Sequence, residues 1–339
     1  MSKKVKVGVI GAGRIGRLHI ENIKKYLGDL AEIKSVADIY INNIKDWLLN
    51  LGIERIYEDY KFVINDKEID AVLICSPTDT HSQYIMESAK EGKHIFCEKP
   101  IDFDVEKAKA AIKEVEKYKV KLQIGFQRRF DPNFKKLKQE IKNGKVGKIH
   151  ILKITSRDPE PPPLSYIEVS GGIFLDMTIH DFDMARFLTE SEVEEVYTSG
   201  NVFINPEIEK YGDIDTAVTL LKFENGIIGI IDNSRKSVYG YDQRIEVFGE
   251  QGSILVENEL NSNLIYMNEK YISKDKPKYF FLERYKDAYV EELRSFFEAI
   301  LYDRNVEVNG IDGLKATLIG LAAKKSFLEK VPIRIERYF

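Results

Sequence analysis

A glycine-rich segment near the start of the chain has the spacing that cradles the phosphates of a dinucleotide. The segment consists of Gly11, Ala12, Gly13, Arg14, Ile15 and Gly16. It follows an apolar run at 5–10 and opens a helical pattern at 14–27, as the G-x-G-x-x-G fingerprint requires. Gly11 permits the tight turn, Gly13 lets backbone N–H groups approach a pyrophosphate, and Gly16 allows helix and strand to touch. The alternative is a glycine-rich turn without a nucleotide.

An acidic residue at the expected distance favours the nucleotide. Asp38 ends the second predicted strand (33–37), 22 residues after Gly16. A carboxylate there accepts hydrogen bonds from both ribose hydroxyls and repels a 2′-phosphate, so NAD is favoured over NADP as the cofactor.

A lysine follows another predicted strand. Lys99 stands between Glu98 and Pro100, after the apolar run 95–97. Ligands of parallel sheets gather beyond the carboxyl ends of the strands, and the proline restricts the backbone next to the lysine. Lys99 is therefore a candidate catalytic residue, and the alternative is a surface lysine in a turn.

Two carboxylates and a histidine are spaced to share one helix face. The sequence predicts a helix over 171–188, in which Asp176, His180 and Asp183 fall at i, i+4 and i+7. A carboxylate that orients an imidazole is an acid/base arrangement. A divalent metal held by Asp176 and His180 is a second interpretation, although the sequence has no H-E-x-x-H motif and no cysteine cluster to complete a site. A structural histidine is the third.

The order of the elements predicts two domains. Strands and helices alternate over residues 1–124, which predicts a parallel, doubly wound α/β (Rossmann) domain. Residues 125–339 predict an α+β domain with an open, largely antiparallel sheet. Its strands are expected at 146–156, 193–202, 216–223, 227–233, 243–249 and 253–257. Two helices are expected at 287–301 and 311–328, and the C-terminal one is a candidate for packing on the first domain.

The composition excludes several classes of partner. The 339 residues contain 51 Lys and Arg against 55 Asp and Glu, a formal net charge of -4, which gives no general attraction to nucleic acid or anionic membranes. No apolar run reaches the ~18 residues of a membrane span, and no cleavable signal pattern is present. Cys75 and Cys97 lie in apolar runs and are expected to be buried thiols. We therefore expect a cytoplasmic protein.

These motifs together resemble the glucose–fructose oxidoreductase / inositol dehydrogenase / rhizopine-catabolism (Gfo/Idh/MocA) family. The residues that carry the resemblance are the glycine-rich segment, Glu98-Lys99-Pro100, and Gly171-Gly172 followed by Asp176 and His180. Residues 156–159, 174–183, 233–235 and 239–244 look most like the inositol 2-dehydrogenase branch. The resemblance spans essentially the whole chain. It implies catalytic roles for Lys99, Asp176 and His180 without a metal, and a substrate domain whose outer sheet face assembles homotetramers.

The expected reaction is NAD-dependent oxidation of a secondary hydroxyl of a cyclic polyol or sugar, with myo-inositol giving 2-keto-myo-inositol. Beyond the glycine-rich segment and Asp38, the expected cofactor contacts are Ser76, Thr78, His81, Glu98, Lys99 and Gln127. The expected substrate contacts are Arg129, Asp158, Asp176, His180, Asp183, Tyr239 and Tyr241. The alternatives are a dehydrogenase of another inositol isomer or an aldose, an NAD-dependent redox-neutral glycosidase, and a non-catalytic NAD-binding sensor.

Overall fold

The computed structural model describes residues 4–335 and contains two units that are each built from two chain segments. The first unit comprises the chain up to Phe130 together with Asp287–Lys315. The second comprises Asp131–Lys286 and the chain from Ala316 onward. The sequence places all of residues 125–339 in the second domain, whereas in the structure residues 287–315 return to the first unit.

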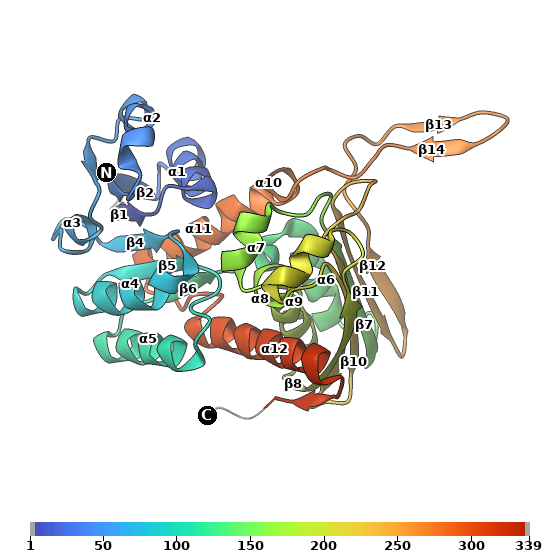
Figure 1. The fold of residues 1–339 in the computed structure, drawn as a ribbon. Coiled ribbons are helices and arrows are strands. Elements are labelled where there is room, and N and C mark those ends of the chain that lie inside the picture. Colours follow the sequence, from blue (N-terminus) through green and yellow to red (C-terminus); the bar gives the residue numbers. More distant parts are fainter. Residues whose placement is uncertain (1–3, 336–339) are drawn as a thin grey trace. The chain divides into compact units, whose positions relative to one another are not determined.

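The first unit is built on a six-stranded sheet with the order β3-β2-β1-β4-β5-β6 (Figure 1). Its strands are β1 Val5–Ile10, β2 Ala31–Ala37, β3 Arg55–Tyr57, β4 Ala71–Ile74, β5 His94–Glu98 and β6 Leu122–Gly125. Every neighbouring pair is parallel. From one edge of the sheet, the strands run back along the chain from β3 to β1 and then forward from β4 to β6. This is the doubly wound arrangement, so the predicted Rossmann fold is confirmed.

Helices connect these strands, as parallel pairing requires. They are α1 Arg14–Tyr26, α2 Lys45–Asn50, α3 Lys61–Ile64, α4 Thr78–Lys90 and α5 Val105–Tyr118, with short 3₁₀ turns at η1 Ile41–Asn43 and η2 Gln127–Phe130. Helix α11 (Lys286–Leu301) adds Leu293, Phe296 and Phe297 to the apolar core that also contains Val7 and Val9 of β1. The returning segment therefore completes the core of the first unit.

The second unit is built on a seven-stranded mixed sheet with the order β12-β11-β7-β10-β9-β8-β15. Its strands are β7 Ile149–Arg157, β8 Val193–Asn201, β9 Thr216–Phe223, β10 Ile228–Ser234, β11 Asp242–Gly249, β12 Gly252–Val256 and β15 Ile333–Arg334. Only the β7–β10 pair is parallel among these neighbours, so the predicted largely antiparallel sheet is confirmed. Along β9, buried residues alternate with more exposed ones, which is typical of a sheet with one covered face.

In the second unit, two short helices stand where the sequence predicts one long helix. The helices are α6 Pro132–Lys142, α7 Leu164–Ser170, α8 Ile173–Asp176, α9 Ile179–Thr189, η3 Pro206–Tyr211, α10 Phe281–Arg284 and α12 Gly310–Glu329, the last of which begins in the first unit. The single helix predicted over 171–188 was wrong, because Met177 and Thr178 separate α8 from α9. Thr178 donates its hydroxyl to Asn233 on β10 at 2.9 Å, and this tertiary contact fixes the junction.

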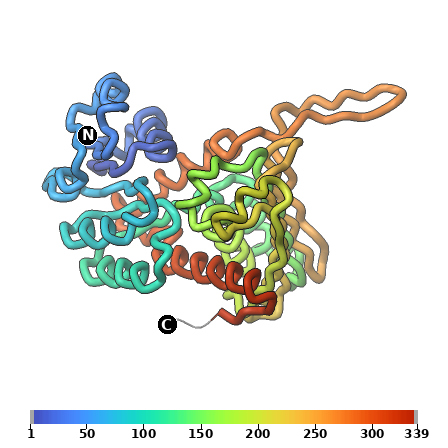
Figure 2. The backbone as a smooth tube through the Cα atoms, in the orientation of Figure 1, coloured from blue at the N-terminus to red at the C-terminus, as the bar shows by residue number. Residues whose placement is uncertain are grey.

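A two-stranded hairpin projects from the second unit. It is formed by β13 Ile265–Met267 and β14 Ile272–Lys274, and every residue of both strands is exposed. Both views show it extending away from the rest of its own unit (Figures 1 and 2).

The sequence contains two cysteines, both of which were expected to be buried. Cys75 is half-buried and Cys97 is buried, and both are free thiols. Burial raises the pKa of each well above its usual range. Among the helices of residues 4–335, none is long and apolar enough to cross a membrane.

Candidate active site

The glycine-rich turn between β1 and α1 has the shape that its sequence predicts. Gly11 has a φ of +88°, and a Cβ there would lie 2.5 Å from the backbone nitrogen of Ser76. A Cβ at Gly16 would lie 2.0 Å from the carbonyl oxygen of Gly11. Both positions therefore exclude any side chain, and the turn passes close to the loop that follows β4.

The first turn of α1 is open to an anion. Gly13 provides no side chain to cap the helix, and no acidic residue lies in the first turn. A Cβ built at Gly13 would meet nothing within 4 Å. The N–H groups of this turn and the helix dipole are therefore available to a pyrophosphate, and the residues present fit a dinucleotide.

Asp38 joins the end of β2 to the glycine-rich turn. Its Oδ2 accepts a hydrogen bond from the backbone N–H of Ala12 at 2.7 Å, and its Oδ1 accepts one from Tyr40 at 2.7 Å. Each carboxylate oxygen has a second lone pair, so these contacts orient the group without exhausting its capacity for ribose hydroxyls.

Replacing Asp38 by serine is expected to raise the use of NADP relative to NAD about tenfold, equivalent to roughly 1.4 kcal/mol. The physical reason is the loss of a negative charge that repels a 2′-phosphate. The measurement is the ratio of kcat/KM for the two cofactors. Asp29, which is exposed, provides the matched Asp29→Ser control. An unchanged ratio in Asp38→Ser would show that the carboxylate does not face the ribose.

The loops after β4 and β5 are tied together by His81. This side chain is 1% exposed, and its two ring nitrogens lie 2.8 Å from the carbonyl oxygens of Ser76 and Pro100. Burial is the main cause that lowers the pKa of His81. The structure thus gives His81 a supporting role for the loop that contains half-buried Lys99, and its predicted direct contact with the cofactor stays a prediction. Of the other expected contacts in these loops, Ser76 and Thr78 are half-buried.

Two residues after β6 are also engaged inside the first unit. Gln127 donates its amide to the hydroxyl of Tyr289 at 3.2 Å. Arg129 is 7% exposed, lies 3.1 Å from a carboxylate oxygen of Asp312, and donates to the carbonyl of Glu307 at 3.4 Å. These contacts position both side chains, and their predicted contacts with cofactor and substrate stay predictions.

In the second unit, Tyr166 and Arg235 are among the side chains that hold Asp176. It is the last residue of α8, and its Oδ1 accepts a hydrogen bond from the hydroxyl of Tyr166 at 2.9 Å. Its Oδ2 lies 3.4 Å from a guanidinium nitrogen of Arg235. The sequence analysis missed Tyr166, because nothing in its spacing connects it to Asp176. Arg235 falls in the segment 233–235 of the resemblance, but its pairing carries no local signal.

Arg235 lies among three acidic residues of this unit, Asp176, Asp213 and Asp158. Its side chain is 1% exposed, and it lies 3.6 Å from a carboxylate oxygen of Asp213. Burial lowers the pKa of Arg235, but Asp176, Asp213 and Asp158 outweigh that effect and raise the pKa overall. Arg235 is therefore charged and balances carboxylates that would otherwise be costly to bury.

Two consecutive glycines directly precede α8 and determine the backbone path into it. Gly171 and Gly172 have φ values of +81° and +83°. A Cβ at Gly172 would lie 2.7 Å from Oδ1 of Asp213, the same oxygen that accepts a hydrogen bond from the backbone of Ile173 at 2.9 Å. The glycine pair is therefore required for the close approach of Asp213 to the helix that ends at Asp176.

Gly172→Ala is expected to lower the free energy of unfolding by about 1–3 kcal/mol, because alanine strains this backbone and meets Asp213. Chemical denaturation measures the change. The matched control is Gly212→Ala, which also has a positive φ (+63°) but open space around its Cβ. Equal losses in the two variants would contradict a specific role for the Asp213 contact.

The helix that carries His180 is anchored to the sheet. Asn233 on β10 accepts from Thr178 and donates its amide to Asp181 at 2.8 Å and to the carbonyl of Ser156 at 3.2 Å. His180 is half-buried and Asp183 is buried. The start of α9 is therefore fixed immediately before His180, although Asp176 and His180 lie on separate helices and do not share one regular helix face.

The remaining predicted substrate residues have diverse environments. Tyr239 donates its hydroxyl to Asp242 at 2.6 Å and accepts from Arg157 at 3.1 Å. Tyr241 is 6% exposed and packs edge-on against Tyr285. Asp158 is half-buried at the end of β7. The hydroxyl of Tyr239 is thus already engaged in a surface network, which the sequence did not indicate.

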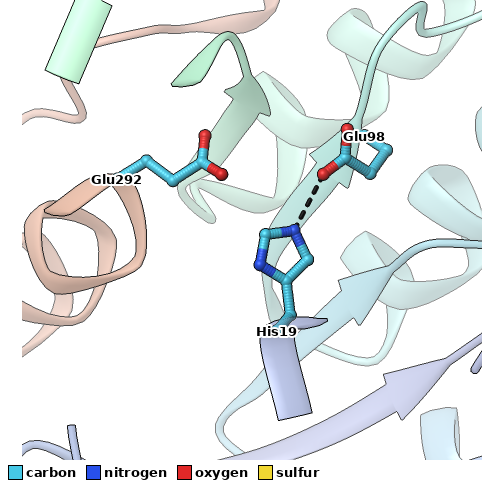
Figure 3. Close-up of side chains that lie close together, drawn as sticks. All are labelled: His19, Glu98 and Glu292. Carbon is cyan, nitrogen blue, oxygen red and sulfur yellow. Dashed lines mark hydrogen bonds and ion pairs between the residues drawn. The ribbon is translucent and has the colours of Figure 1, made fainter. Parts of the chain in front are cut away.

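A further group of titratable side chains lies in the first unit. His19, Glu98 and Glu292 place one potential ligand atom each within 4.8 Å of one another (Figure 3). Only Glu98 among them was predicted as a site residue. His19 follows Gly16 by three residues on α1, and this position on the helix that begins at the glycine-rich turn is the only local signal for it.

Comparison with known proteins accounts for both units. Residues 5–126 match the oxidoreductase family with an NAD-binding Rossmann fold, and residues 134–255 match the GFO/IDH/MocA C-terminal domain. The chain belongs to the Gfo/Idh/MocA family. It is therefore an NAD-binding oxidoreductase, which confirms the predicted enzyme class and cofactor.

Several members of the Gfo/Idh/MocA family are similar over the full length. The chain is 50% identical over 336 residues to the oxidoreductase YrbE of Bacillus subtilis, with 99% of this chain and 98% of the relative covered. It is 49% identical over 332 residues to myo-inositol 2-dehydrogenase of Thermotoga maritima (98% and 99% covered). A solved structure of scyllo-inositol dehydrogenase from Lactobacillus casei, with bound NAD(H) and scyllo-inositol, is 30% identical and superposes with a TM-score of 0.91 (98% and 99% covered).

Proposed function

We propose that this chain oxidises a secondary hydroxyl of an inositol with NAD, and that myo-inositol is the substrate and 2-keto-myo-inositol the product. The observation that carries the proposal is the seating of Asp176 between Tyr166 and Arg235, directly before the anchored helix of His180. The full-length similarity to the Thermotoga maritima enzyme supports myo-inositol, and the Lactobacillus casei structure supports an inositol in general.

Each proposed role follows from the chemistry of the side chain. Bound NAD supplies the hydride acceptor. His180, as a neutral imidazole, takes the hydroxyl proton as general base. Lys99 donates a hydrogen bond to the oxygen as negative charge develops on it. Asp176 positions His180 for this proton transfer. Because Lys99 stabilises the oxygen, the proposed mechanism requires no metal.

Other residues are proposed to bind and not to react. The first-turn N–H groups of α1 bind the pyrophosphate, and Asp38 binds the ribose. Asp158 and Asp183 accept hydrogen bonds from those hydroxyls of the inositol that are not oxidised. A neutral polyol needs such hydrogen-bonding side chains, because it offers no charge for recognition.

We also propose that the chain forms a homotetramer through the exposed face of the second sheet. By the strand register, this face carries the exposed side chains of Ile151, Tyr197, Val218, Leu220, Ile228, Phe248 and Leu255. Lys153, Lys222 and Glu246 lie among them on the same face, so the apolar side chains form an interrupted patch. Exposed apolar patches are typical of interfaces between copies. The proposed location is the cytoplasm.

The experiment for the reaction is spectrophotometric. NADH formation is measured with myo-inositol, scyllo-inositol, other inositol isomers and hexoses. Net NADH with myo-inositol as the most efficient substrate is the expected result. Preference for scyllo-inositol would correct the isomer. Release of sugar from a glycoside without net NADH would support the glycosidase, and NAD binding without turnover would support the sensor.

A further inference from the structure

An arginine on α1 contacts the residue that joins Asp38 to the glycine-rich turn. The Nε of Arg17 donates to the carbonyl oxygen of Ala12 at 3.3 Å, and the backbone N–H of Ala12 donates to Oδ2 of Asp38 at 2.7 Å. The cation and the carboxylate therefore contact the two ends of one residue. Along these contacts and the backbone of Ala12, the path from the Nε of Arg17 to the carboxylate is at most about 10 Å long.

The guanidinium of Arg17 is turned toward the chain segment that follows Asp38. Its Cζ lies 5.2 Å from the ring centroid of Trp47 on α2, and α2 is the helix that follows β2. A guanidinium over an indole ring is held by a cation–π interaction. Arg17 is nevertheless exposed, so the contacts with Ala12 and Trp47 orient the group while N–H donors stay accessible.

The charge of this guanidinium is not neutralised by a neighbouring acid. Within residues 4–335, the polar contact of Arg17 is the neutral carbonyl of Ala12, and no carboxylate forms an ion pair with it. The first turn of α1 also contains no acidic residue. An arginine fork with donors to spare matches the oxygens of a phosphate and can bind two of them at once. Arg17 is therefore an oriented cation with capacity for an anion.

The segment after β2 provides no cation of its own for such an anion. Residues 39–44, which follow Asp38, contain neither lysine nor arginine. Arg14, the first residue of α1, lies within the glycine-rich segment, where the pyrophosphate is expected. In dinucleotide-binding folds, an acid at the end of this strand binds the ribose of NAD, and a nearby arginine accommodates the 2′-phosphate of NADP. By its position beside Ala12, Arg17 fits the second of these roles.

We propose that Arg17 is a second residue that determines cofactor specificity, because its guanidinium binds the 2′-phosphate of NADP⁺. Asp38 and Arg17 then act in opposite directions: the carboxylate repels the 2′-phosphate and the guanidinium attracts it. NAD is favoured while both are present, and Arg17 supplies the affinity for NADP⁺ that appears when the carboxylate is removed. This inference rests on the proposed placement of the adenosine ribose at Asp38.

The test is a double-mutant cycle on the full-length protein, with the Kd for NAD⁺ and for NADP⁺ measured by titration without an inositol. Arg17→Gln is expected to raise the Kd for NADP⁺ about tenfold, as for the loss of one hydrogen bond to a charged group. The Kd for NAD⁺ is expected to stay within about twofold of the wild type. In the Asp38→Ser background, Arg17→Gln is expected to cancel most of the gain in NADP⁺ binding.

Two further variants control for charge and for surface effects. Arg17→Lys keeps the charge without the planar fork, so its Kd for NADP⁺ is expected to fall between those of the wild type and Arg17→Gln. Arg304→Gln is the matched control, because Arg304 is also exposed and lies over an aromatic ring, 5.0 Å from the centroid of Tyr302. It is expected to leave both dissociation constants unchanged.

The outcomes separate this inference from the proposed function. An unchanged Kd for NADP⁺ in Arg17→Gln overturns the inference, and so does an equal loss of NAD⁺ and NADP⁺ binding, which would assign the guanidinium to the shared pyrophosphate. In both cases, NADH formation from inositol by the wild type would still support the function. Binding of neither dinucleotide by the wild type would contradict both.

Two practical difficulties leave the test decisive. If the wild type binds NADP⁺ too weakly to titrate, Asp38→Ser with and without Arg17→Gln decides, and equal affinities for NADP⁺ overturn the inference. If Arg17→Gln does not fold, Arg17→Lys must still raise the Kd for NADP⁺ and leave that for NAD⁺ unchanged.

Discussion

Replacement of His180 by alanine is expected to lower kcat for inositol oxidation by about 10²–10⁴-fold. The hydroxyl proton must leave as the hydride departs, and alanine provides no group to receive it. The N–H groups and the carboxylate proposed to hold NAD belong to the first unit, whereas His180 belongs to the second. The Kd for NAD is therefore expected to stay close to that of the wild type.

Steady-state kinetics and an NAD titration on the same preparation check this prediction. His150, an exposed residue of β7, provides the matched His150→Ala control, for which near-native turnover is expected. Near-native kcat in His180→Ala would remove His180 from the mechanism. A loss confined to NAD affinity would point to a misplaced cofactor and not to a missing base.

Arg235→Met is expected to lower the free energy of unfolding by about 3–5 kcal/mol. The guanidinium is 1% exposed and lies near the carboxylates of Asp176 and Asp213. Methionine preserves much of the volume but leaves these acids without their buried cation. Protonation of Asp176 and Asp213 would remove their negative charges. The difference in the free energy of unfolding between Arg235→Met and the wild type is therefore expected to be smaller at low pH.

Chemical denaturation at neutral and acidic pH measures this effect. Arg334→Met is the matched control, because the Arg334 side chain is 76% exposed and its ion pair with Glu195 spans 4.0 Å. A change within about 0.5 kcal/mol is expected for this control. If Arg235→Met were as stable as the wild type, the acids around it would have to be neutral or solvated, and the proposed seating of Asp176 would need revision.

Local patterns explain why most of the fold could be predicted. The Rossmann strands are apolar runs bounded by turn residues, and the second sheet has alternating strands with hairpin turns at Asn225-Gly226 and Gln251-Gly252. Strand β3 was missed because its three residues, Arg55–Tyr57, lie at the sheet edge and are not fully buried. The break between α8 and α9 was missed because a contact with Asn233, 55 residues from Thr178, decides it.

In the candidate site too, features set by neighbouring residues could be predicted, and contacts between residues far apart in the sequence could not. The geometry of Gly11 and Gly16 could be predicted, because the motif and its strand–turn–helix context are contiguous in sequence. The partners of Asp176 could not, because Arg235 is 59 residues away. His19 and Glu98 are 79 residues apart, so neither residue signals the other. The sequence carried no signal for the contacts of Arg129 with Asp312 or of His81 with the carbonyl oxygens of Ser76 and Pro100, and the predicted ligand contacts of both residues stay predictions.

The return of α11 to the first unit has a consequence for how the protein is made. Leu293, Phe296 and Phe297 belong to the same core as β1, so the core of the first unit cannot close until about nine-tenths of the chain has left the ribosome. A nascent chain that ends near Phe130 exposes apolar surface that only the last part of synthesis covers. The cofactor-binding unit is thus the first to be translated and among the last to be finished.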